Sequence, residues 1–435
     1  MSTYQEFFRG KRVTVLGLGL LGRGVGDAAF ISAQGGIVTV TDKKSEAELA
    51  DSVARLPAGI QKRLGGHSLS DFTDTDMVIK AAGVRLDSPE IAAARAANVP
   101  VYMSTALAAR FAREAGARVV GITGTRGKST VTHLIAHTLT RAGKRAHLGG
   151  NIRGVSTLAL LPQVKSADIL VLELDSWQLQ GFGDLQMSPD VAVFTNLMPD
   201  HQNYYADMDE YFADKANIFR YQKEGDVLVC GALIESRIEA VRSIVEPCVP
   251  AALPPEWTLH VIGEHNRENA ALAAEALRAL TLSEEEIRAG LESFEPVEGR
   301  LQLVREMNGV RIYNDNNATT PEATLAALKA LDTGTQNIVL IMGGADKYLD
   351  ASTLLYEIAK TCKRVILLAG TGTSRVAPLM QDYSIFDSLE TAVHEAVASA
   401  ESGDTILFSP AFASFGMFKN EYERSDEFVK FITAL

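Results

Sequence analysis

Short uninterrupted runs of apolar residues recur along this chain, and the stretches between them repeat their apolar residues every three or four positions. The runs at 169–172, 191–194 and 338–342 are examples. Such runs are typical of parallel strands buried on both faces, whereas the longer repeat is typical of amphipathic helices. Their alternation predicts an α/β protein built on mostly parallel sheets.

The same pattern divides the chain into three segments, each with its own expected sheet. The expected strands lie near 11–16, 37–41, 77–80 and 99–103, then 117–120, 169–174, 191–195 and 227–230, and finally 309–313, 337–342, 364–368 and 405–408. We therefore expect three α/β domains. These are a Rossmann-like N-terminal domain (1–104), a central P-loop ATPase-like domain (105–297) and a Rossmann-like C-terminal domain (298–435).

Composition narrows the class of protein. The 435 residues are 46% hydrophobic and carry a net charge of −12, which argues against a nucleic-acid-binding surface. No stretch approaches the roughly 18 apolar residues of a membrane span, and the N-terminus lacks the apolar core of a signal peptide. The three cysteines (Cys230, Cys248 and Cys362) are far apart, which favours a reducing compartment. We expect a cytoplasmic monomer without nucleic-acid or membrane partners.

The stretch Gly121–Thr130, called the phosphate loop below, carries the most specific chemistry. It reads Gly-Ile-Thr-Gly-Thr-Arg-Gly-Lys-Ser-Thr and lies between an expected strand and an expected helix. Its glycines let backbone N–H groups point at phosphate oxygens, and the helix start adds partial positive charge. Lys128 can reach the β- and γ-phosphates, and Ser129 or Thr130 can hold Mg²⁺. The first glycine stands at Gly124 rather than at position 122, so the loop is a variant, and a glycine-rich turn without a nucleotide is the alternative.

A second glycine-rich turn, Gly17–Gly22, follows the first expected strand. It reads Gly-Leu-Gly-Leu-Leu-Gly, and Asp42 ends the next strand about 20 residues later. This spacing is typical of dinucleotide-binding turns, whose acidic residue binds a ribose hydroxyl. It predicts a nucleotide-like ligand, with a tight turn and no ligand as the alternative.

Chemically active residues follow other strands of the second segment, at the edge where open α/β sheets bind ligands. Glu173 ends a buried strand, where its carboxylate can face the phosphate loop and bind Mg²⁺. His201 lies on the loop after the strand that ends near Thr195, and this position favours a functional role over a structural one. Lys215 lies on an expected helix, where lysines are usually solvated, so the pattern alone gives it no role.

The third segment repeats this arrangement at three strand ends. Asp315, Lys347 and Ser414 each stand in a polar loop directly after an expected strand. For each residue alone, a turn or cap role is as good an interpretation as ligand binding. Together they predict a site for a small charged ligand, and Lys347 suits a carboxylate.

Taken together, these motifs resemble the Mur ligase family, the ATP-dependent amino-acid ligases of peptidoglycan precursor synthesis. The resemblance runs from about Gly10 to Leu435. Its pieces, in matching order and spacing, are Gly17–Gly22, Thr123–Thr130, Gly150–Ile152, Glu173–Leu179, Thr195–His201, His265–Asn266, Gly299–Arg300, Asn314–Asp315, Gly343–Lys347 and Ser409–Asn420. It implies that ATP phosphorylates the carboxylate of UDP-N-acetylmuramoyl-L-alanine and that the amine of D-glutamate attacks the acyl phosphate.

The resemblance also implies a role for each matching residue. Lys128, His201 and Lys215 would be catalytic; Ser129 and Glu173 would hold one Mg²⁺, and His201 and a carbamylated Lys215 a second. ATP would be bound by Gly124, Thr125, Gly127, Lys128, Ser129, Thr130, Asn266, Asn269, Arg300 and Asp315. The UDP-substrate would be bound by Gly17, Leu20, Leu21, Gly22, Asp42 and Asn151, and glutamate by Thr319, Lys347 and Ser414.

The chain departs from the family pattern in four places. Asp175–Trp177 replaces a usual Ser-Ser-Phe, Ala81–Gly83 a Ser-Pro-Gly, Asn316–Thr319 a Ser-Lys-Ala-Thr, and Glu421 an aromatic residue. One lysine near the reaction centre is therefore absent. The departures leave the ligase chemistry standing but keep open L-glutamate or another amino acid as the substrate.

Proteins of other classes fit the sequence less well. A folate-type polyglutamate ligase would lack the separate fold of Gly17–Asp42. A nicotinamide dehydrogenase would leave the Lys128 loop without a use. A non-catalytic regulatory homologue would be expected to lose Lys128, Glu173, His201 or Lys215, and all four are present.

Overall fold

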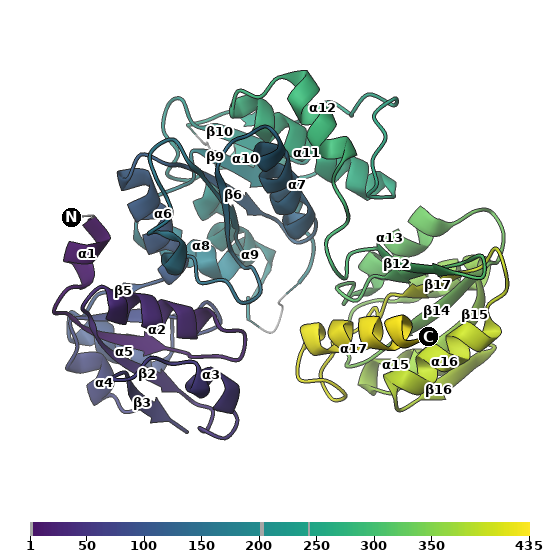
Figure 1. Cartoon of the computed structure of the whole chain (residues 1–435), viewed down its shortest axis with the longest axis horizontal. Coiled ribbons are helices and arrows are strands. Elements are labelled where there is room, and N and C mark those ends of the chain that lie inside the picture. Colours follow the sequence, from purple (N-terminus) through teal and green to yellow (C-terminus); the bar gives the residue numbers. More distant parts are fainter. Residues whose placement is uncertain (1–2, 201–203, 242–243) are drawn as a thin grey trace. The chain divides into compact units, whose positions relative to one another are not determined.

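The computed structural model (Figure 1) describes residues 3–200, 204–241 and 244–435. The chain forms two compact units, one of residues 1–252 with 269–291 and one of residues 253–268 with 292–435. Within the described residues the first unit holds two sheets and the second holds one, and most strand pairs are parallel. The predicted α/β class is therefore confirmed, while the boundaries at 104/105 and 297/298 stay a prediction.

The N-terminal sheet is parallel throughout. Its elements are α1 (Thr3–Phe8), β1 (Arg12–Leu16), α2 (Arg23–Ala33), β2 (Ile37–Asp42), α3 (Ala50–Ala54), β3 (Gln61–Leu64), α4 (Ser70–Thr73), β4 (Met77–Lys80), α5 (Pro89–Ala96) and β5 (Val101–Tyr102). The strand order is β3-β2-β1-β4-β5. Leu16 pairs with both Thr41 and Lys80, so the loops after β1, β2 and β4 leave the sheet side by side.

The central sheet is also parallel and has the order β11-β10-β9-β6-β8-β7. Its elements are α6 (Ser104–Glu114), β6 (Arg118–Thr123), α7 (Lys128–Arg141), β7 (Ala146–Gly150), β8 (Ile169–Glu173), α8 (Ser176–Asp184), β9 (Val191–Phe194), α9 (Met208–Lys215), β10 (Val227–Cys230), α10 (Glu235–Ala240), β11 (Pro247–Cys248), α11 (Glu264–Ala279) and α12 (Glu284–Glu292). Ile122 pairs with Glu173 and Thr123 with Phe194. The phosphate loop therefore leaves the sheet between the ends of β8 and β9.

One apolar core runs through both of these sheets. It includes Val13 and Val15 of β1, Phe111 of α6, and Leu170 and Leu172 of β8, all almost completely buried. Burial of such side chains is the main force that holds a domain together. Because the core is continuous, loops of the N-terminal and central sheets belong to one body.

The C-terminal sheet has the order β12-β13-β17-β14-β15-β16, with only the β12–β13 pair antiparallel among the described strands. Its elements are β12 (Gln302–Met307), β13 (Val310–Asn314), α13 (Pro321–Leu331), β14 (Ile338–Gly343), α14 (Ser352–Thr361), β15 (Cys362–Leu368), α15 (Thr371–Val376), β16 (Tyr383–Phe386), α16 (Leu389–Ser399), β17 (Thr405–Phe408) and α17 (Glu421–Ala434). Leu340 and Leu407 lie in one core cluster and Ile341 and Phe408 in the other, so helices cover both faces of this sheet.

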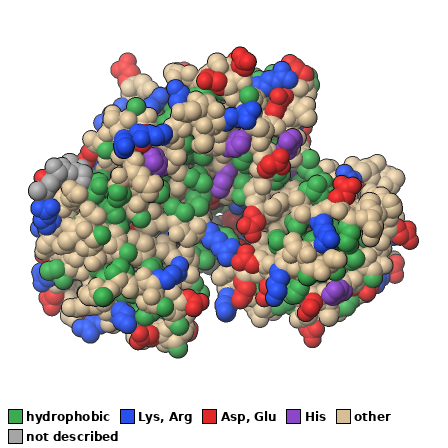
Figure 2. Space-filling view, viewed as in Figure 1, with side chains coloured by type: hydrophobic (Ala, Val, Ile, Leu, Met, Phe, Trp, Pro, Cys, Tyr) green, Lys and Arg blue, Asp and Glu red, His purple; other side chains and the backbone are tan. Residues whose placement is uncertain are grey.

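The surface agrees with the composition. Acidic and basic side chains are mixed over the face shown in Figure 2, with apolar side chains between them. In the part of the chain that the structure describes, no helix combines the length and the apolar character that a bilayer span needs.

Candidate functional site

The backbone of the phosphate loop requires its glycines. Gly124 and Gly127 have φ angles of 143° and 81°, which side-chain-bearing residues rarely adopt. A Cβ atom on Gly124 would collide with the Thr195 hydroxyl, and one on Gly127 would collide with the Asn269 amide. Asn269, predicted to bind the nucleotide, is thus packed directly against the loop.

Asn196 and Thr195, which follow β9, hold the loop in place. The Arg126 N–H donates to Asn196 Oδ1 at 2.9 Å, and the Thr195 hydroxyl donates to the Arg126 carbonyl at 2.5 Å. The Thr125 N–H donates to the Asn196 carbonyl at 2.9 Å. The sequence motif includes both residues, but their positioning role was not predicted, since it depends on how β9 and β6 pair.

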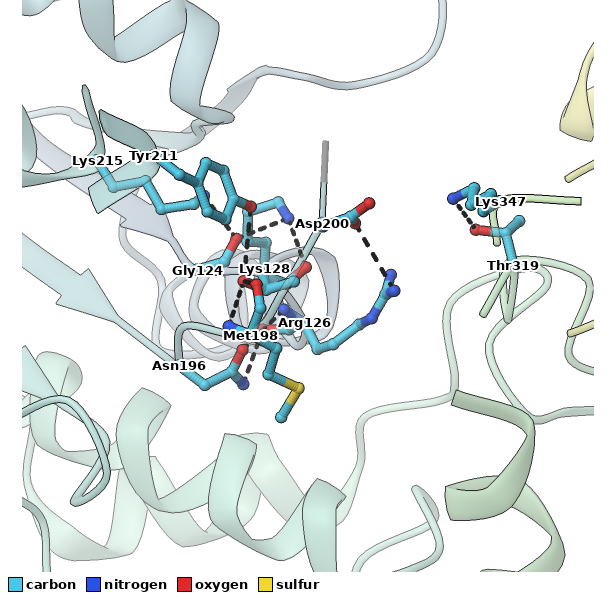
Figure 3. Close-up of polar contacts among 11 residues, drawn as sticks. Gly124, Arg126, Lys128, Asn196, Met198, Asp200, Tyr211, Lys215, Thr319 and Lys347 are labelled. Atoms are coloured by element: carbon cyan, nitrogen blue, oxygen red, sulfur yellow. Dashed lines mark hydrogen bonds and ion pairs between the residues drawn. The ribbon is translucent and has the colours of Figure 1, made fainter. Parts of the chain in front are cut away.

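Two lysine amines converge on one carbonyl of the loop (Figure 3). Lys128 Nζ donates to the carbonyls of Gly124 and Thr125 at 2.9 and 3.0 Å. Lys215 Nζ, at the end of α9, donates to the same Gly124 carbonyl at 2.8 Å and contacts the Thr123 hydroxyl at 3.3 Å. The structure therefore brings both predicted catalytic lysines to the phosphate loop.

The prediction that a helical lysine is solvated is wrong for Lys215. Only 1% of this residue is exposed, because the face of α9 that carries it packs against the central sheet. Burial, and next the positive charge of Lys128, hold the pKa of Lys215 well below its usual value. A buried amine with a depressed pKa spends more of its time uncharged and nucleophilic.

Hydroxyl and carboxylate oxygens stand at the edge of the sheet where Mg²⁺ was predicted. Glu173 ends β8 and Ser129 lies in the first turn of α7, and both are buried. Asn151 donates to Glu173 through its backbone N–H at 2.7 Å and approaches Oε1 through its amide at 3.5 Å. Such oxygen donors fit a hard cation. His201, the other predicted ligand, lies outside the described residues, and the described ones contain no cluster of three His, Cys, Asp or Glu side chains.

The turn Gly17–Gly22 and Asp42 come together as predicted for a nucleotide site. Gly17, Gly19 and Gly22 all have positive φ angles, and the Gly19 N–H donates to Asp42 Oδ2 at 3.1 Å. Leu20 and Leu21 lie on the turn and are partly exposed. A pocket of about 520 Å³ lies beside the turn and is lined by residues that include Gly17, Asp42, Lys43, Gly83 and Arg85. Its volume fits a nucleoside.

Lys80 is a further residue of this region that the sequence did not single out. It is 2% exposed, and its amine donates to the Val84 carbonyl at 2.9 Å and contacts those of Ala81 and Ala82 at 3.5 Å. Burial lowers the pKa of Lys80 to about 8. The lysine thus orders the loop that forms one wall of the pocket.

The residues predicted to bind glutamate, Thr319, Lys347 and Ser414, lie in the second unit. Lys347 Nζ donates to the Thr319 hydroxyl at 3.2 Å (Figure 3), and Ser414 is buried on the loop after β17. A backbone bridge between Ala345 and Ala413 joins the loop of Lys347 to that of Ser414. The three residues therefore stand on adjoining loops.

Arg424 of α17 holds two of these loops together. Its guanidinium is completely buried and donates to Asn316 Oδ1 at 2.7 Å, to the Asn316 carbonyl at 3.0 Å and to the Phe412 carbonyl at 3.2 Å. Asn316 lies three residues before Thr319, and Phe412 lies two before Ser414. Sequence reasoning missed Arg424 because a lone arginine on an amphipathic helix is normally solvated.

The remaining predicted nucleotide residues belong to the second unit, unlike Asn269. Asn266 is buried and donates to the Ile262 carbonyl at 2.8 Å. Asp315 accepts from the Ser409 hydroxyl at 2.8 Å and from the Leu301 N–H at 3.0 Å. Burial raises the pKa of Asp315 to about 7, against the opposing effects of these hydrogen bonds and the neighbouring Arg300.

Comparison with known proteins shows which family of proteins this chain resembles. Three family models match the chain: a Mur ligase MurD-like N-terminal domain at 11–103, a Mur ligase middle domain at 122–246, and a Mur ligase, glutamate ligase domain at 299–412. The chain is 36% identical to UDP-N-acetylmuramoylalanine--D-glutamate ligases of Roseiflexus sp. (strain RS-1) and Anaeromyxobacter dehalogenans (strain 2CP-C). The two matches include 97% and 98% of this chain, respectively, and 98% of each relative. The MurF ligase of Thermotoga maritima, solved in complex with ADP, shares the fold with a TM-score of 0.62 at 17% identity over 100% of both chains.

Proposed function

Since this chain belongs to the Mur ligase family, we propose that it is an ATP-dependent ligase that joins D-glutamate to UDP-N-acetylmuramoyl-L-alanine in peptidoglycan precursor synthesis. The observation that carries the proposal is the similarity along almost the whole chain to relatives named for this reaction. The phosphate loop and its two lysines supply the matching chemistry. ATP is the phosphoryl donor, and ADP and phosphate are the products.

The phosphate loop performs the first step by placing positive charge around the transferred phosphoryl group. A carboxylate is a poor electrophile, and its oxygen must approach a γ-phosphate that carries the same sign of charge. Backbone N–H groups held by Asn196, the start of α7 and the Lys128 amine screen that charge. In this structure the Lys128 amine rests on the carbonyls of Gly124 and Thr125, from which it can turn toward phosphate.

Mg²⁺ would be held by Ser129 and Glu173, and a second ion by His201 and Lys215. Bound magnesium neutralises charge on the phosphates. The Asn151 amide approaches the Glu173 carboxylate at 3.5 Å and would help to orient that ligand. The donor chemistry supports this assignment.

A carbamate on Lys215 would turn a buried cation into a carboxylate-like ligand. Carbamate formation requires a neutral amine that attacks CO₂ and loses a proton. The buried position and depressed pKa of Lys215 suit this reaction. Burial makes a charged ammonium group costly at this position. Pairing the carbamate with a metal ion would offset the cost of burying its negative charge.

The substrates would occupy different parts of the molecule. Gly17, Leu20, Leu21, Gly22 and Asp42 would bind the UDP part beside the pocket, and Asn151 the muramoyl side. Thr319, Lys347 and Ser414 would bind glutamate, and Asn266, Asn269, Arg300 and Asp315 the adenosine part of ATP. The proposal also includes a cytoplasmic monomer without nucleic-acid or membrane partners.

A panel of amino acids tests the proposal. Purified protein is mixed with ATP, Mg²⁺ and UDP-N-acetylmuramoyl-L-alanine, and each D- and L-amino acid is added in turn. We expect ADP release and a product of matching mass with D-glutamate, and neither without the UDP-substrate. Preference for L-glutamate would keep the ligase and change its substrate, whereas preference for a neutral or basic amino acid would overturn the assignment.

A further inference from the structure

Two arginines from different elements meet the turn Gly17–Gly22. Arg23 is the first residue of α2 and follows Gly22 directly. Arg55 follows α3, and its guanidinium nitrogen lies 3.1 Å from the position that a Cβ on Gly22 would take. Any larger residue at position 22 would therefore push Arg55 aside. Two arginines therefore lie next to Gly22, at the end of the turn.

Within the described residues neither arginine forms a direct ion pair with a carboxylate, although Arg23 lies close enough to the buried Asp27 to act on its charge. Arg23 donates to Asn151 Oδ1 at 2.9 Å, and Arg55 donates through Nε to the Asp51 carbonyl at 3.1 Å. Both partners are neutral oxygens, so both guanidinium groups keep donors and charge for an anion. In a chain with a net charge of −12, two such arginines at one turn are a local exception.

The position of Arg23 is fixed by packing between α2 and the central domain. The Ser156 hydroxyl donates to the buried Asp27 carboxylate at 2.6 Å, and a Cβ on Gly26 would lie 2.6 Å from that of Ser156. The contact between Arg23 and Asn151 therefore belongs to a tightly packed interface. Asn151 in turn adjoins Glu173.

These contacts form a path through the first unit. The nucleoside-sized pocket lies at Gly17, the turn and its two arginines come next, and Asn151 and Glu173 follow. A UDP-sugar carries its parts in the same order, namely nucleoside, diphosphate, sugar and reacting carboxylate. If a UDP-sugar lies along this path, its diphosphate lies beside the two arginines.

We propose that Arg23 and Arg55 bind the diphosphate of the UDP-substrate, and that Arg23 joins this anion to Asn151. The inference rests on the proposed function and adds two contacts to it. Guanidinium groups offer forked N–H donors that match phosphate oxygens. The backbone N–H groups of the turn would supply the remaining hydrogen bonds.

Calorimetric titration with UDP and with uridine tests the inference, because the two ligands differ only in the diphosphate. We expect Arg23→Leu and Arg55→Leu each to weaken UDP binding by about 10- to 100-fold, as for loss of a charged hydrogen bond. Uridine binding should stay within about twofold of wild type. Arg23→Lys keeps the charge and should recover part of the loss.

Arg12→Leu is the matched control. It removes the same charge from the same domain but at the opposite end of β1, where Arg12 pairs with Asp76. UDP binding by this variant should equal that of wild type. A fold check by circular dichroism accompanies each variant.

Three outcomes would overturn the inference. Unchanged UDP affinity in both leucine variants would show that the arginines do not contact the diphosphate. Equal losses of UDP and uridine affinity would show that they only shape the pocket. Wild-type protein that binds neither ligand would overturn the proposed function as well, which distinguishes the two failures.

Discussion

At the scale of single residues, burial distinguishes the two lysines that are predicted to be catalytic. Lys128 and Lys215 share the Gly124 carbonyl, but only Lys215 is fully enclosed. Lys128 could be predicted from the sequence because its loop has a specific spacing. The burial of Lys215 could not, since it depends on how α9 packs against the central sheet.

We expect Lys128→Ala to abolish ADP release while the protein stays folded. The amine donates to the carbonyls of Gly124 and Thr125 on the phosphate loop, and its loss removes charge stabilisation of phosphoryl transfer. The rate should fall by about 100-fold or more. ADP release and the thermal unfolding midpoint are the measurements, with Lys223→Ala, an exposed lysine of the same unit, as the control. Near-normal turnover by the folded variant would contradict this role.

Lys215→Ala should be almost inactive, and short-chain carboxylates should restore part of its activity. The variant opens a small space beside Gly124 in which an added carboxylate can replace the carbamate oxygens. ADP release is measured with and without added formate or acetate, and intact mass or density shows the state of Lys215. Full activity of the variant, or a plain amine in an active crystal, would exclude the carbamate.

Asp315→Asn should change how stability depends on pH. The pKa of Asp315 is raised to about 7 in the folded protein, above its unfolded value of about 3.9, so the folded state holds the proton more tightly. The stability from this group is complete below pH 4 and is lost as the pH rises through 7. Denaturant unfolding at pH 5 and pH 8 should therefore show wild type losing more free energy of unfolding than Asp315→Asn. Parallel pH profiles would contradict the raised pKa.

At the scale of elements, the apolar runs in the sequence correctly predicted the inner strands of all three sheets. They did not predict several strands at the sheet edges. The unpredicted strands β3, β7, β11, β12 and β16 all lie at the edge of a sheet. An edge strand has a neighbour on one side only, and its side chains are partly exposed, so it carries polar residues. Gln61–Leu64 of β3 and Gln302–Met307 of β12 show this pattern. The loops that carry the site follow inner strands, which is why most of them could be placed from the sequence.

Arg424→Lys should separate the positioning of two loops from the stability of α17. Lysine keeps the charge but cannot reach Asn316 and Phe412 together, so the free energy of unfolding should fall by about 2–4 kcal/mol. The KM for glutamate should rise because Thr319 and Ser414 lose their fixed spacing. Lys430→Ala, on the exposed face of the same helix, is the control. A loss of stability with an unchanged glutamate KM would leave Arg424 with a structural role only.

At the scale of the whole molecule, the predicted glutamate site and the phosphate loop lie in different units. Asn266, Arg300 and Asp315, predicted to bind ATP, share the second unit with Lys347, but Lys347 itself is predicted to bind glutamate. We therefore expect Lys347→Ala to weaken the use of glutamate and to leave ATP affinity unchanged. Loss of a charged contact to a carboxylate should lower kcat/KM for glutamate. The corresponding loss of transition-state stabilisation is about 2–5 kcal/mol. Titration with a non-hydrolysable ATP analogue provides the second measurement. Equal effects on both ligands would contradict this separation.

Neither compact unit is a single stretch of chain, and this has a consequence for synthesis on the ribosome. The first unit consists of residues 1–252 and 269–291, and the residues between them, 253–268, belong to the second unit. Residues 270–277 of α11 and 287–291 of α12 bring buried alanine, leucine and isoleucine side chains to it. A nascent chain that has emerged only to residue 252 lacks this cover and exposes an apolar face. The last part of the first unit to be translated is thus the part that protects the growing chain from aggregation.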